Sequence, residues 1–243
     1  MRYAIKLVEA GAVSKAICIL ESKGLGDINL PQIRAQMEQK HPQSRDEWDH
    51  DLSGAERIQL TDCEAELTKL RRHAGMGVDR FPFEYLIHIK GGVMPEGIRQ
   101  GALLAISALG SRILNYDLPG WFYVLWTTPL LFAPFKDVGT QHCRPVSAGN
   151  ARRRFYGRCH AANNGAAIKA DAEPTQLGSA TPAGVQAMGI GLQLHFDVWK
   201  YVQHIIKVDL KNSFNMVERA AIMESVRSRH GLRAHVRYWE AES

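Results

Sequence analysis

The spacing of apolar positions predicts two short helices at the start of the chain. Residues 3–22 have a helical period that breaks at Gly11, where a glycine favours a turn. The residues that follow, 24–60, are rich in polar side chains and have no sustained period. We therefore expect two helices over residues 3–22 and a long loop over residues 24–60.

Three further helices are expected before residue 131. Thr61 and Glu64 have the spacing of a capping box, which marks a helix start. Pro95 is well placed to begin an apolar helix over about residues 98–114, because its fixed φ suits the first helical turn. Another helix is expected near residues 121–131. The apolar faces of the first two contain Leu67, Leu70, Ile98, Leu103, Ile106 and Leu109.

The pattern changes after residue 134. Residues 135–150 predict two short extended segments that meet at a turn around Gly139. Residues 150–168 predict a helix with a basic face, residues 174–184 are typical of a loop, and residues 184–200 predict another helix. The second half therefore mixes short strands with helices.

Residues 202–210 are apolar and rich in β-branched side chains, which predicts a strand that ends near Asp209. Asn215 and Glu218 have capping-box spacing, so a turn and a helix should follow. Asp209 is either a surface or capping carboxylate, or a Mg²⁺ ligand whose coordination is completed by nucleotide phosphates. Phe214 is either a core side chain or the wall beside a bound sugar. The stripe of the expected helix is Met216, Ala220, Met223 and Val226.

Charge is unevenly distributed along the chain. Residues 1–130 are nearly neutral, with 15 basic and 16 acidic side chains, whereas residues 131–243 have 15 basic and 9 acidic ones. This basic excess favours an anionic partner for the second half.

Neither a membrane partner nor secretion is expected. The most apolar stretch, residues 120–135, is too short to span a bilayer and contains two prolines. The N-terminal residues lack the apolar segment of a signal peptide. The four cysteines show no disulfide framework, which favours a reducing, intracellular compartment. The pairs His142-Cys143 and Cys159-His160 lack the spacing of zinc ligands, so buried thiols are favoured over a zinc site.

Three segments resemble blocks of the reverse transcriptases of non-LTR retrotransposons. IIKVDLKNSFNMVER, residues 205–219, resembles the first catalytic motif: an apolar strand, an aspartate, Asn-Ala-Phe-Asn and a helix. FKDVGTQHCRPVSAGNARRRFYGRCHA, residues 135–161, is similar to the fingers segment, where a lysine precedes Arg-Pro-Ile and a basic helix. QLGSATPAGVQA, residues 176–187, resembles the Gln-Leu-Gly block between them. The three blocks follow the family's order.

The resemblance implies an α+β fold. Residues 1–130 would form the mostly helical region that precedes the fingers. Residues 131–243 would form part of the fingers and the first strand and helix of an incomplete antiparallel palm sheet.

The resemblance also implies a role for each matching residue. Asp209 matches the carboxylate that binds both catalytic Mg²⁺ ions. Phe214 matches the gate residue that disfavours a 2′-hydroxyl on the incoming nucleotide. Lys136 and Arg144 match the fingers residues that hold its triphosphate. The implied partners are an RNA template, a DNA primer and a deoxynucleoside triphosphate.

Other matching residues concern the template and the nucleic-acid backbone. Gln176 and Gly178 match a block near the template strand. A group of arginines on the basic helix would either contact backbone phosphates or form a solvated face, and both interpretations remain open. These arginines are Arg152, Arg153, Arg154 and Arg158.

Part of the family's catalytic site has no counterpart in the sequence. The remaining carboxylates of the family come from a hairpin with an aromatic-x-Asp-Asp motif, but the chain has no two adjacent aspartates. Only 34 residues follow Asp209, and catalysis with two metal ions needs several carboxylates. We therefore expect a truncated fragment that does not polymerise nucleotides by itself.

Two other classes of protein remain possible. A non-catalytic, basic nucleic-acid-binding protein derived from such an element would bind in a salt-dependent manner without incorporating nucleotides. A helical interaction protein would show no affinity for nucleic acid even at low salt. The order of the three blocks favours polymerase ancestry over both.

Overall fold

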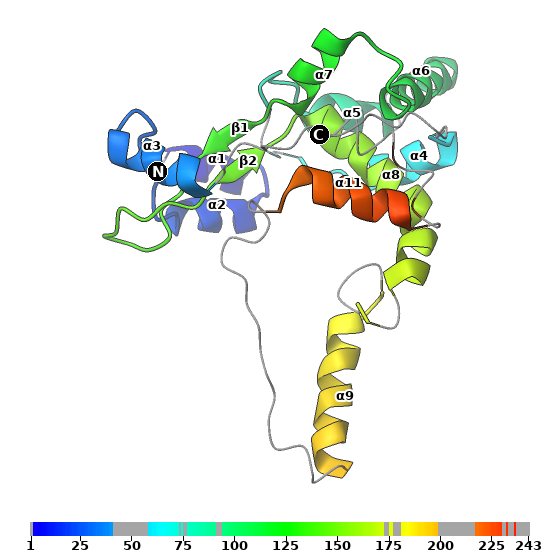
Figure 1. Ribbon diagram of the computed structural model, residues 1–243. Coiled ribbons are helices and arrows are strands. Elements are labelled where there is room, and N and C mark those ends of the chain that lie inside the picture. The colour runs from blue at the N-terminus through cyan, green and yellow to red at the C-terminus, as the bar shows by residue number, and fades with distance from the viewer. Residues whose placement is uncertain are drawn as a thin grey trace. The chain divides into compact units, whose positions relative to one another are not determined.

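The computed structural model describes residues 2–40, 58–72, 74, 77–90, 94–172, 175–176, 181–198, 217–229, 232 and 236. Over these residues the chain is mostly helical with one small antiparallel sheet, so the predicted α+β class is confirmed at that level (Figure 1). The chain divides into two compact units. The first unit comprises residues 1–43 and 131–147, and the second comprises residues 44–130 and 148–243. The division at residue 130 proposed from the sequence stays a prediction.

Among its described residues, the first unit contains three helices and most of the sheet. Ala4, Leu7 and Ala16 bury the contact between the first two helices, and Gly11 has a φ of +73° in the turn that separates them, as expected from its position. The elements are α1 (Arg2–Glu9), α2 (Val13–Leu20), α3 (Pro31–Lys40), β1 (Leu130–Phe132) and β2 (Val146–Ala148), of which Leu130 and Ala148 fall to the second unit.

Helix α3 corrects one expectation from the sequence. Residues 24–60 were expected to form a loop, but residues 31–40 are helical. Pro31 occupies the first helical position, where its missing amide hydrogen costs nothing. Ile33 and Met37 are buried one turn apart, and the other side chains of this helix are largely polar. Two apolar positions in ten residues are too few to reveal a period.

The described part of the second unit is mostly helical. Its elements are α4 (Leu60–Thr68), α5 (Phe83–Lys90), α6 (Glu96–Leu114), α7 (Gly120–Thr127), α8 (Ala151–Ala172), α9 (Gly184–Val198) and α11 (Arg219–Ser228). All of them except α5 correspond to helices expected from the sequence. The expected strand over residues 202–210 lies outside the described residues.

The core of the second unit lies where α4 packs against α5, α6 and α8. Leu67, Leu103 and Phe155 are fully buried there. The buried face of α6 differs from the expected one, because Ile98 and Leu109 are exposed. Both positions lie roughly 120° or more around the helix from Leu103, at 3.6 residues per turn. Among the described residues, no helix combines the length and hydropathy that a membrane span requires.

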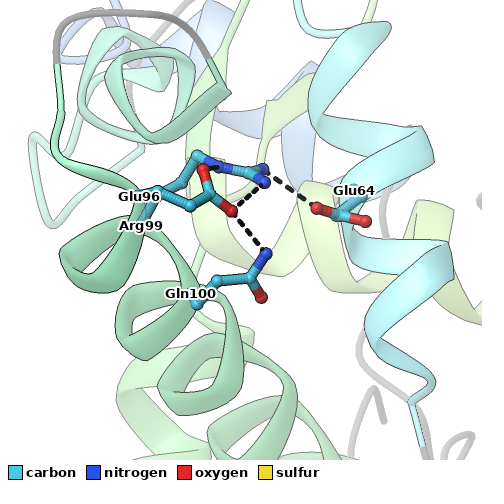
Figure 2. Close-up of polar contacts among 4 residues, drawn as sticks. All are labelled: Glu64, Glu96, Arg99 and Gln100. Carbon is cyan, nitrogen blue, oxygen red and sulfur yellow. Dashed lines mark hydrogen bonds and ion pairs between the residues drawn. The ribbon is translucent and has the colours of Figure 1, made fainter.

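The capping box expected at Thr61 does not form. Helix α4 begins at Leu60, and Gln59 at its N-cap makes no side-chain capping bond. Glu64 instead pairs across to α6, where its Oε1 lies 2.9 Å from Nη1 of Arg99 (Figure 2). Arg99 also donates two hydrogen bonds to Glu96, and Gln100 donates a third to the same carboxylate. A charged cluster therefore joins α4 to the first turns of α6.

This cluster predicts a pH dependence of stability. The hydrogen bonds from Arg99 and Gln100 lower the pKa of Glu96 from 4.5 to about 2. Because the folded-state pKa is below the unfolded one, the contribution of Glu96 is complete above pH 4.5 and is lost as the pH falls towards 2. In urea titrations, the stability difference between the native chain and Glu96→Gln should shrink over this window. A difference that stays constant from pH 5 to pH 2 would contradict the assignment.

Candidate functional site

The structure describes part of the predicted site. Asp209, Phe214 and Gly178 lie outside the described residues. Lys136 and Arg144 lie in the first unit, on the segments that connect β1 and β2. Gln176 follows the end of α8, and its backbone amide donates a hydrogen bond to the carbonyl of Ala172. The four predicted arginines lie on α8.

Lys136 and Arg144 belong to one antiparallel hairpin. The hairpin continues from β1 and β2 through a bridge between Phe135 and Cys143. The amide of Lys136 donates to the carbonyl of His142 over 2.7 Å, and the amide of Arg144 donates to the carbonyl of Pro134 over 2.9 Å. This register places Lys136 opposite His142 and Arg144 opposite Pro134. The expected extended segments around residue 139 are confirmed.

The two faces of the hairpin have opposite character. Side chains of a strand alternate between its faces, so Lys136, His142 and Arg144 share one face. All three are exposed. On the other face Cys143 is only 1 % exposed and packs in a cluster with Ile33. The remaining members of this cluster are Met37, Ala133, Leu131 and Phe135. The burial of one face therefore directs both predicted phosphate-binding side chains to solvent.

Residues 24–26 extend the hairpin by a third segment. Leu25 forms an antiparallel bridge with Pro134, and Gly26 donates to the carbonyl of Ala133 over 2.8 Å. A Cβ at Gly26 would lie 2.8 Å from Sγ of Cys143, so a glycine is needed for this close approach. No pattern in the sequence predicts this pairing, because residues 24–60 look like an aperiodic loop.

Side chains of helix α3 form hydrogen bonds with the backbone groups along the opposite edge of the hairpin. The amide side chain of Gln36 accepts a hydrogen bond from Cys143 N over 3.1 Å and donates to the carbonyl of Gln141 over 3.0 Å. The Lys40 ammonium donates to the carbonyl of Cys143. Gln36 thus provides both hydrogen bonds that a neighbouring strand would make. The N-terminal segment therefore holds the hairpin along both edges and across its buried face.

The arginines of α8 are engaged within the second unit. Arg152 forms an ion pair of 3.0 Å with Asp79, and Arg153 donates to the carbonyl of Thr127 over 3.0 Å. Arg154 lies 4.7 Å from the ring centre of Phe83, and burial lowers its pKa. Arg158 lies 3.4 Å from the buried carboxylate of Glu66. Each guanidinium contacts a group of its own unit, and a role in nucleic-acid binding stays a prediction.

An apolar cavity of about 340 Å³ lies beside the Arg152–Asp79 pair. Phe122 and Trp126 stack in its wall with ring centres 5.5 Å apart. Its other lining residues are Val78, Trp121, Leu125 and Asn150. The cavity has room for a ring, and its one cation is already paired.

The described part of the chain shows no cluster of metal ligands, and three of its thiols are buried. Within that part, no three side chains among His, Cys, Asp and Glu gather as a metal site requires. Cys63 of α4 and Cys159 of α8 are fully buried and share a hydrogen bond, which lowers the pKa of Cys63 and raises that of Cys159. Cys143 is also buried, as expected for a structural thiol.

Comparisons with protein-family models, with curated proteins and with solved structures find no match to this chain.

Proposed function

We propose that this chain is a fragment of the reverse transcriptase of a non-LTR retrotransposon, with the hairpin of residues 130–148 as the triphosphate-binding part of its fingers. One observation carries the proposal: Lys136 and Arg144, which the sequence resemblance assigns to triphosphate binding, share the exposed face of a hairpin whose other face is buried. The sequence separation of these two residues does not require this arrangement. It follows from the hairpin register.

The lack of competing ion pairs within the described residues also supports the proposal. Within the described residues, no acidic side chain forms an ion pair with Lys136 or Arg144, in contrast to Arg152 and Arg158 of α8. An arginine offers a planar fork of donors that matches phosphate oxygens, and a lysine offers a point charge. The exposed face of the hairpin can therefore accept an anionic group without first breaking an ion pair to either residue.

The catalytic part of the proposal rests on the sequence. Asp209 would hold Mg²⁺, and Phe214 would contact the sugar of the nucleotide. A single such aspartate, without the adjacent pair that the family uses, cannot hold two ions firmly. We therefore expect the fragment to extend no primer by itself. Binding of a nucleoside triphosphate by the hairpin does not need the second metal ion.

Nucleotide binding tests this function directly. The full chain should bind the magnesium complex of dTTP in isothermal titration calorimetry. Lys136→Gln and Arg144→Gln should each weaken binding about tenfold, because each removes a charge-assisted contact worth about 1.5 kcal/mol. Arg34→Gln on the exposed surface of α3 removes a positive charge from the same unit and should leave the affinity unchanged.

Three results would overturn parts of this proposal. Equal affinities for all variants would remove the hairpin from the site. Salt-dependent binding of RNA without any binding of dTTP would favour the alternative, a non-catalytic nucleic-acid-binding protein. Primer extension on an RNA template that is lost in Asp209→Ala would show a working polymerase and would refute the expected inactivity.

A further inference from the structure

The exposed face of the hairpin carries basic side chains, and a lysine of the N-terminal segment lies close to them. The hairpin register places Lys136 beside His142, and Arg144 lies one row away. The strand pairing of the N-terminal segment ends at Gly24, whose φ is +92°, and the exposed Lys23 lies just before it in the chain.

The Lys23 side chain reaches across to the hairpin. Its ammonium donates a hydrogen bond of 2.8 Å to the carbonyl of Lys136 and lies 3.6 Å from a carboxylate oxygen of Asp137. Its side chain remains 46 % exposed, and that of Asp137 remains 57 % exposed. Lys23 is therefore anchored to the backbone of the very residue that the sequence assigns to triphosphate binding.

Like charges that lie close together on a protein surface repel each other. The hydrogen bond from Lys23 to the carbonyl of Lys136 nonetheless brings two lysines together, and Asp137 is the only acidic partner of Lys23 within the described residues. An anion bound over this face would neutralise both lysines at once. Lys136 and Arg144 lie on two neighbouring strands, which are about 4.8 Å apart, and Lys23 adds a third cation at their edge, so the group suits a chain of phosphates better than a single small anion.

We propose that Lys23 is a third phosphate-binding residue of the face that carries Lys136 and Arg144, and that Asp137 holds its ammonium until a polyphosphate displaces the carboxylate. This inference rests on the proposed function and deepens it, because the triphosphate site then requires the N-terminal segment. Nothing in the sequence resemblance assigns a role to Lys23 or Asp137.

The two residues have opposite expected effects, which separates electrostatics from a loss of structure. Lys23→Gln keeps a donor for the carbonyl of Lys136 but removes the charge, so it should weaken binding of tripolyphosphate and of magnesium-dTTP about fivefold. Asp137→Asn removes the competing carboxylate, so it should tighten binding about twofold, since exposed ion pairs contribute little. Lys23→Arg should restore most of the affinity. Lys6→Gln, an exposed lysine of α1, serves as the matched control.

Calorimetry of the full chain with each ligand distinguishes the outcomes. Weaker binding for Lys23→Gln together with tighter binding for Asp137→Asn supports the inference. An unchanged affinity of Lys23→Gln, while Lys136→Gln and Arg144→Gln weaken binding, overturns the inference and leaves the proposed function standing. An equal loss for Lys23→Gln and Asp137→Asn shows a purely structural contact and also overturns it. The absence of binding by the native chain refutes the proposed function itself.

Discussion

Replacement of Phe155 by alanine is expected to destabilise the second unit by about 3–5 kcal/mol. The side chain is fully buried on α8, and its ring centre lies 5.3 Å from that of Tyr156. It belongs to the cluster in which α4, α6 and α8 meet, with Leu67 and Leu103. A truncation there removes apolar contact area and leaves a cavity that helices of three different segments line, so the site cannot collapse easily.

Chemical denaturation followed by far-ultraviolet circular dichroism measures this loss. Because whole domains are stable by only about 5–15 kcal/mol, Phe155→Ala should move the unfolding midpoint to a markedly lower urea concentration. Trp121→Ala is a suitable control, since this larger aromatic side chain is 66 % exposed on α7. Equal effects of the two substitutions would show that the core does not lie where α8 meets α4 and α6.

Replacement of Gly77 by alanine is the second large effect, although it adds only one methyl group. A Cβ at this position would lie 2.5 Å from Cα and 2.7 Å from the backbone nitrogen of Asn150. Backbone atoms at the start of α8 cannot move aside as a flexible side chain can. The turn of residues 77–80 would have to separate from α8, which also breaks the Asp79–Arg152 pair. We expect a cost of about 3 kcal/mol, at the upper end of typical overpacking.

Gly101→Ala is the control, because we expect it to change the free energy of unfolding in the opposite direction. Gly101 lies inside α6, and a Cβ there would meet nothing within 4 Å. Gly101→Ala should therefore stabilise the chain by about 0.5–1 kcal/mol, because glycine is a poor residue for a helix interior. If Gly77→Ala and Gly101→Ala shift the urea unfolding midpoint equally, Gly77 does not lie as close to the start of α8 as described.

Local patterns predicted much of the helical structure. The break at Gly11, the proline before α6 and the stripe of Met223 and Val226 on α11 depend on neighbours a few residues apart, and all three are confirmed. Helix α3 escaped prediction because only Ile33 and Met37 mark its buried face. The capping box at Thr61 was wrong, because the helix starts at Leu60 and Glu64 pairs with Arg99 instead.

The candidate site shows more clearly that local patterns do not predict contacts between distant parts of the chain. Lys136 and Arg144 could be named from the resemblance, and the turn that the sequence predicts at Gly139 is confirmed, since this glycine has a φ of +76°. Lys23 could not be found, because its place beside Lys136 depends on a strand pairing between distant parts of the chain. The partners of the α8 arginines, Asp79 and Glu66, are also distant from them in sequence.

The hydrogen bond between Gln36 and Cys143 joins residues 107 positions apart, which has a consequence for synthesis on the ribosome. Helices need only local contacts, whereas this sheet must wait until both of its parts have been made. At about 5–20 residues per second, the N-terminal segment emerges roughly 5–20 seconds before the hairpin that it holds. During that interval Ile33 and Met37 have no hairpin to cover them. We therefore expect chaperones to bind the nascent N-terminal segment during this interval.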